Sequence, residues 1–147
     1  MAEMVSYSEQ KLLECIVHKS TESLQDIHMM LGKVYDRELA LELNRQAVGY
    51  SRLKEQASVQ LLNTGIVPVP VSVLERARRW GILQARTAWN VNTGYVAGML
   101  ARDEENRRQD MEQAVRRMQV CGKASCELAE EFLDFEEKSI QILKTYC

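Results

Sequence analysis

The stretch from Leu39 to Leu62, LALELNRQAVGYSRLKEQASVQLL, constrains the fold most strongly because its apolar or small residues recur every three or four positions. This spacing places them on one face of an α-helix. The face consists of Ala40, Leu43, Ala47, Tyr50, Ala57 and Leu61. Lys54 interrupts the series, and its aliphatic stem can lie along the face with the ammonium in water. The stretch predicts a helix whose apolar face must be covered by other elements.

Both ends of this helix carry the expected signals. Asp36 suits the N-cap, and Glu38 places negative charge in the first turn, where the helix dipole favours it. Gly65 suits the position after the last turn, and Pro68 and Pro70 prevent the helix from continuing. We therefore expect a helix over residues 36–64.

The composition favours one all-helical domain over residues 1–147. Hydrophobic residues make up 46% of the chain and charged residues 27%, which is typical of a globular protein. The only two prolines are neighbours at Pro68 and Pro70, so long uninterrupted segments remain on both sides. The net charge of -2 gives no general attraction for nucleic acid.

We expect a cytoplasmic protein without a transmembrane helix. No run of about 18 apolar residues occurs. The first residues, MAEMVSYSEQ, lack the basic start and apolar core of a signal peptide. The four cysteines form no CxxC pair and are expected to be reduced thiols without a role; they are Cys15, Cys121, Cys126 and Cys147.

The segments before and after the central helix are also predicted to be helical. A first helix over residues 8–33 is joined to the central one by a link at Val34–Asp36, so the two are antiparallel neighbours. The segment IVPVPVSV after Gly65 is read as an extended crossover, because each proline restricts the residue before it. Ser72 then caps a short helix over 73–86, with Glu75 at capping-box spacing. Its four arginines are interpreted as a solvated face paired with acidic neighbours, in preference to a nucleic-acid site; they are Arg76, Arg78, Arg79 and Arg86.

Two more long helices are expected, over residues 88–120 and 123–146. The run RDEENRRQD at 102–110 has no apolar residue, but Arg107 and Arg108 stand at pairing distance from neighbouring carboxylates along a helix. The alternative is a break near Asp103. The sequence also leaves open whether this run faces solvent or meets Glu and Arg partners inside the bundle as an ionic layer, which would be costly. The last helix has the apolar face Ser125, Leu128, Phe132, Phe135, Ile142 and Tyr146, and its opposite, solvated face is acidic: Glu127, Glu130, Glu131, Asp134, Glu136 and Glu137.

These four long segments predict an up-down-up-down four-helix bundle, with the crossover and short helix between its second and third members. In arrangement the chain resembles the ferritin-like four-helix bundles, specifically small bacterial bundle proteins of unknown function. The residues that carry the resemblance are the register Gln46, Tyr50, Leu53, Ala57, Leu61, then Gly65 and Pro68, the tryptophan-bearing segment and the run Tyr95–Met99.

The resemblance implies a di-metal carboxylate centre in the functional members of that group, with a Glu on each of two helices and Glu-x-x-His on each of the other two. This sequence departs from that pattern. Its two histidines, His18 and His28, are both on the first helix, and the residues three positions before them are Cys15 and Gln25. Nucleotide-binding, hydrolase and metalloprotease motifs are also missing from the sequence. We therefore expect no catalytic, cofactor-binding or metal-binding residues.

Two functional hypotheses remain. The first is a non-catalytic bundle acting through protein contacts as a homo-oligomer or with a protein partner, with Met29, Met30, Trp80 and Trp89 either on the contact surface or packed under the crossover. The second is a metal-binding or redox ferritin-like protein. Its ligands would be Glu14 and His18, one turn apart and next to Cys15, with a carboxylate such as Glu137, or else Cys121 and Cys126.

Overall fold

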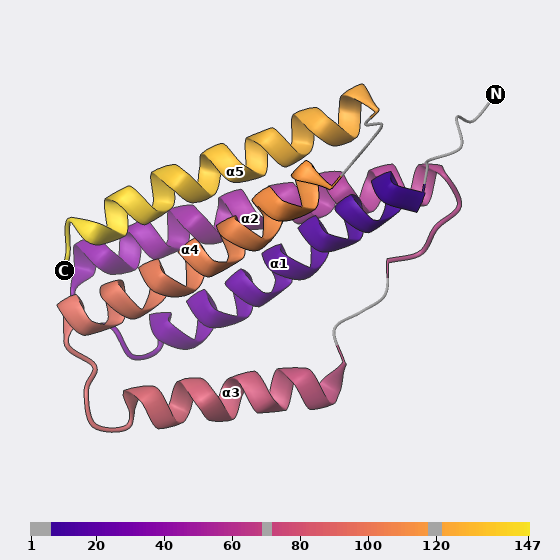
Figure 1. Cartoon of the computed structure of the whole chain (residues 1–147). Coiled ribbons are helices and arrows are strands. Elements are labelled where there is room, and N and C mark those ends of the chain that lie inside the picture. The colour runs from indigo at the N-terminus through magenta and orange to yellow at the C-terminus, as the bar shows by residue number, and fades with distance from the viewer. Residues whose placement is uncertain (1–6, 69–71, 118–121) are drawn as a thin grey trace.

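The described part of the chain is entirely helical. The computed structural model describes residues 7–68, 72–117 and 122–147, and they contain no strand. The five helices are α1 (Tyr7–Leu31), α2 (Arg37–Asn63), α3 (Val73–Thr87), α4 (Thr93–Arg116) and α5 (Lys123–Lys144). Helices α1, α2, α4 and α5 lie side by side, and α3 lies apart along the outside of this group (Figure 1).

The α1–α2 pair forms as its sequence predicts. The Asp36 side chain accepts a hydrogen bond from the Leu39 amide at 2.9 Å, so the predicted N-cap is confirmed. Gly65 has φ +84°, a conformation that glycine adopts at little cost, and it ends α2 before the prolines. Helix α1 ends at Leu31, two residues earlier than expected, because the amides of Lys33 and Val34 both turn back to the Met30 carbonyl.

The directions of the four packed helices differ from the expected alternation. Helix α3 carries the chain back along the length of the group, so α4 begins at the same end as α2 and runs parallel to it (Figure 1). Each pair of neighbours in contact around the group, α1–α2, α2–α5, α5–α4 and α4–α1, is antiparallel. The prediction of strict up-down-up-down order failed because it treated residues 65–87 as a joint at one end.

Helix α4 corrects two further expectations. Residues 88–92 are not helical, so the predicted helix over 88–120 begins only at Thr93. The Asn92 side chain accepts a hydrogen bond from the Gly94 amide, and Asn90 accepts one from the Asn92 amide, which together cap the helix and turn the chain before it. The alternative break near Asp103 is wrong, because α4 continues to Arg116. The predicted end near residue 120 lies outside the described residues.

The core is built around Tyr50 and the phenylalanines of α5. The Tyr50 ring lies 4.9 Å from the Phe135 ring, edge to face, and 6.2 Å from that of Phe132. Phe135 packs over the bare backbone of Gly49, where a Cβ atom would collide with it. Each packed helix contributes leucines or other large apolar side chains that are nearly inaccessible to solvent. None of the described helices is long and apolar enough to cross a membrane.

Candidate functional site

Polar side chains from all four packed helices are buried in the core. They are Ser20, Ser23 and Asp26 of α1, Gln46 and Tyr50 of α2, Glu104 and Arg107 of α4, and Glu136 and Ser139 of α5. One expectation is therefore wrong, because Glu136 does not belong to the solvated face of α5. Arg107, of the run 102–110 whose exposure the sequence left open, lies inside. A sequence signal was available, because Glu104 and Arg107 continue the 3–4 spacing of Ala97, Leu100 and Met111. We call these nine residues the interior polar cluster.

Asp26 is the ionic centre of the interior polar cluster. It is fully buried, and its Oδ2 atom accepts a hydrogen bond from Arg107 Nη1 at 3.1 Å. Arg79 of α3 binds both carboxylate oxygens, at 2.8 Å and 2.5 Å. Burial opposes the charged form of Arg107 most strongly, but Asp26 and the other acidic groups around Arg107 together outweigh it, so the pKa of Arg107 is raised. One carboxylate thus neutralises a buried guanidinium and at the same time holds an outer helix.

Two further carboxyl groups in the cluster favour the protonated state. Burial raises the pKa of Glu104 from 4.5 to about 8, and the opposing effects of Arg107 and the Tyr50 hydroxyl are smaller. The Tyr50 hydroxyl donates to Glu104 Oε1 at 3.2 Å. Burial also raises the pKa of Glu136 well above its ordinary value. Tyr50 lies close enough to affect the pKa of Glu136, but no described group makes a hydrogen bond of good geometry to either oxygen of that carboxyl.

The chemistry open to this cluster is limited by its enclosure. Tyr50, Gln46 and Glu136 are 0% exposed and Glu104 is 2% exposed, so a dissolved substrate does not reach their reactive atoms. Within the described ranges, no three His, Cys, Asp or Glu side chains lie close enough to hold one metal ion. What the cluster can do is hold protons on Glu104 and Glu136 and hold α3 through Asp26.

Helix α3 is attached to the packed helices by polar contacts and a narrow apolar seam. In addition to Asp26, Arg79 contacts Asp103 at 3.2 Å, and Arg86 contacts the same carboxylate oxygen at 3.2 Å. Only Leu83 and Thr87 of α3 are buried. The expectation that arginines of this segment pair with acidic neighbours is confirmed for Arg79 and Arg86.

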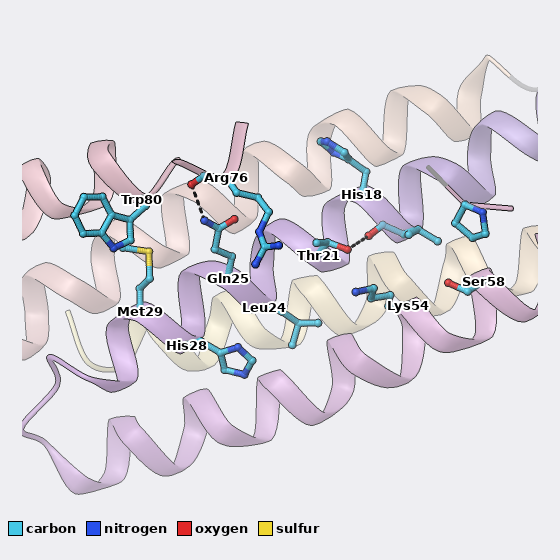
Figure 2. A pocket seen from close by; sticks show the side chains of 12 residues that line it. His18, Thr21, Leu24, Gln25, His28, Met29, Lys54, Ser58, Arg76 and Trp80 are labelled. Carbon is cyan, nitrogen blue, oxygen red and sulfur yellow. Dashed lines mark hydrogen bonds between the residues drawn. The ribbon is translucent and has the colours of Figure 1, made fainter. Parts of the chain in front are cut away.

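Because α3 stands away from α1, a groove remains between them. It has a volume of about 780 Å³. Its lining comes from one face of α1, from Lys54 and Ser58 of α2, from Pro68, and from Arg76 and Trp80 of α3. Figure 2 shows Trp80 and Met29 close together at one end, and Arg76 reaching over α1 beside Gln25. Of the four apolar residues singled out in the sequence, Met30 is in the core, Met29 and Trp80 line this groove, and Trp89 is 97% exposed.

The residues of the metal hypothesis do not form a site. Glu14 contacts Gln10 and Lys11, whereas His18 lies 3.4 Å from Glu22 and 3.7 Å from Glu75. Glu137 lies 3.4 Å from Arg108 of α4, so it is not beside the α1 pair.

The cysteines add no ligand set among the described residues. Burial raises the pKa of the Cys15 thiol, which makes the reactive thiolate less abundant. Cys126 is disulfide-bonded, so the expectation of a reduced thiol there is wrong, and Cys121 lies outside the described residues. Cys147 is a free, exposed thiol.

Comparisons with protein families, with curated proteins and with solved structures found no match to this chain.

Proposed function

We propose that the chain is a non-catalytic helical bundle that acts through protein–protein contacts, and that it associates with a second copy of itself. The observation that carries this proposal is the outward face of α3. On this face Leu74 is 80% exposed and Ile82 40%. Val73, on another side of the helix, is 82% exposed, and Trp89, just beyond the helix, is 97% exposed. Large apolar side chains gathered in solvent on one short segment are typical of a contact surface.

The sequence of α3 explains why this face is free. Leu74, Arg78 and Ile82 follow one another at four-residue spacing along one side of the helix, and Arg78 and Ile82 also border a hollow beside α1. Arg79, Leu83 and Arg86 occupy another side, which contacts the packed helices. Burying the outward face therefore requires a second chain. A twofold-related copy meets this requirement because it presents the same patch, in which Arg78 and the exposed Glu75 carry opposite charges beside the apolar side chains.

The interior supports a non-catalytic role. Its titratable groups are closed to solvent, and the strongest contacts of Asp26 are with arginines of the same chain. We also propose a ferritin-like bundle arrangement, supported by the antiparallel neighbours and by the crossover that runs the length of the group (Figure 1).

Sedimentation velocity over a wide range of protein concentration tests self-association. We expect the native chain to form a dimer and the double variant Leu74→Glu, Ile82→Glu to remain a monomer, because both charges would have to be buried in the contact. Val48→Glu is the matched control, since Val48 is 71% exposed on α2, away from α3. The proposal is refuted if the native chain stays monomeric at every concentration. It is also refuted if the double variant dimerises as the control does.

One observation favours a second candidate, a metal-binding or redox protein. Glu104 Oε2 and both oxygens of Glu136 are buried without a hydrogen-bond partner among the described groups, and carboxylates inside four-helix bundles are the ligands of that class. Arg107 already supplies positive charge there. Elemental analysis of protein purified without chelator distinguishes the two candidates. Stoichiometric iron, zinc or manganese supports the second candidate. Metal-free protein whose melting temperature does not change when metal is added excludes the second candidate.

A further inference from the structure

The groove between α1, α2 and α3 has the size of a small-molecule site. Its volume of about 780 Å³ falls within the range of about 300–1,000 Å³ that is usual for ligand pockets. Three separate elements wall it, so a ligand inside would contact α1 below it and α2 and α3 on either side (Figure 2). It is distinct from the outward face of α3, because Trp80 and Arg76 lie on the side turned toward α1.

The charge of the lining is positive. No aspartate or glutamate is among the described residues that line the groove. Lys54 enters from α2 and Arg76 from α3, and neither forms an ion pair with any residue of the described ranges. By contrast, Arg79 and Arg86 of the same helix are both paired. In a chain of net charge -2, two cations left without carboxylate partners in one groove point to an anionic ligand.

The carboxylates of the neighbouring hollow, which shares His18 and Gln25 with the groove, do not neutralise these two cations. Glu22 and Glu75 line this hollow, and both are turned to His18, at 3.4 Å and 3.7 Å. Arg76 is held in place through its backbone, because Gln25 Nε2 donates to the Arg76 carbonyl oxygen at 2.9 Å (Figure 2). That bond fixes this turn of α3 against α1 and leaves the guanidinium free.

The other end of the groove is apolar. The Trp80 indole is 57% exposed and lies next to the Met29 thioether (Figure 2). Leu24 of α1 adds an apolar side chain nearer to Lys54. An exposed indole flanked by a polarisable sulfur suits a flat or aliphatic body of moderate size. We propose that this groove binds a small organic anion, with its apolar body against Trp80 and Met29 and its carboxylate, phosphate or sulfonate bound by Arg76 and Lys54.

Two fluorescent probes with the same aromatic body test the proposal on the full-length chain. One is the anionic anilinonaphthalene sulfonate, and the other is the neutral phenylnaphthylamine. We expect the native chain to bind the sulfonate at one site about tenfold more tightly than the amine. Arg76→Gln and Lys54→Gln should each weaken sulfonate binding about fivefold and leave amine binding unchanged. Trp80→Ala should weaken both probes.

Arg78→Gln is the matched control, because Arg78 is an exposed arginine of α3 that does not line the groove, and it should change neither affinity. Added sulfate should displace the sulfonate probe from the native chain but not the amine, a readout that needs no variant. Equal affinity for the two probes overturns the proposal. Sulfonate binding that persists when Arg76 and Lys54 are both replaced also overturns the proposal. The same holds if sulfonate binding is lost in Leu74→Ser on the outward face.

Discussion

Replacing Glu104 by glutamine should remove much of the pH dependence of stability. In the folded chain the pKa of Glu104 is about 8, against an ordinary value of 4.5, so between these values the folded chain holds a proton that the unfolded chain has lost. The stabilisation is complete below about pH 4.5 and is lost as the pH rises through about 8. Each pH unit in this window changes the free energy of unfolding by about 1.4 kcal/mol, so the interval of about 3.5 units corresponds to about 5 kcal/mol at most.

Glutamine suits this test because it keeps the size of the side chain and an oxygen to accept the Tyr50 hydrogen bond. Urea unfolding followed by circular dichroism from about pH 5 to about pH 8 should show the native chain losing roughly 3 kcal/mol or more. The Glu104→Gln chain should lose much less, with the remaining slope due to Glu136, whose pKa is raised in the same direction. Glu130→Gln, at an exposed position of α5, should keep the native slope. A native slope in Glu104→Gln would contradict the raised pKa of Glu104. So would a native chain that becomes more stable as the pH rises.

Two further substitutions test the interior and the close approach of the helices. Asp26→Ala should lower the free energy of unfolding by about 3–5 kcal/mol, because it leaves Arg107 buried without its carboxylate; a loss below about 1 kcal/mol in urea unfolding would contradict this. Gly49→Ala should cost about 1–3 kcal/mol in the same assay, since the added methyl group collides with Phe135. The methyl group added by Gly81→Ala would point into open space, so this substitution within a helix should stabilise α3 by about 0.5–1 kcal/mol. Amide hydrogen exchange in α3 should then become slower, and faster exchange would contradict this expectation.

The local structure of α2 was predictable because its signals are local. Asp36, the apolar face and Gly65 act within a few residues of one another, and each has the predicted role. Ser72 likewise caps α3 as its spacing from Glu75 indicates, by accepting the Glu75 amide hydrogen bond. The start of α4 was missed because Asn90 and Asn92 compete for backbone hydrogen bonds more effectively than the helical pattern of Trp89 and Val91 suggests.

The interior polar cluster was harder to predict because the usual assumption places charged residues in water. Glu104, Arg107 and Glu136 stand at positions of the apolar faces of α4 and α5, so their spacing alone would have put them inside. Their charges argued for the surface, and the sequence does not show the partner Asp26, which is 81 residues away from Arg107. A search of the apolar register for polar residues would have found these three positions.

The groove had little sequence signal. Arg76 and Trp80 are one helical turn apart on α3, but Lys54 belongs to α2, and each alone resembles an ordinary surface residue. They come together only because the ion pairs of Arg79 hold α3 beside α1. Tertiary placement of one helix therefore decides whether this region is a binding site or featureless surface.

The sharing of Asp26 between Arg79 and Arg107 has a consequence for redesign of the chain. Helix α3 looks dispensable, and trimming it away would be the obvious route to a smaller scaffold. The trimmed chain would keep the buried pair of Asp26 and Arg107 but would lose Arg79, the second cation bound to Asp26. A designer would have to replace Asp26 and Arg107 together with well-packed apolar side chains, an exchange that is often neutral or stabilising in protein interiors.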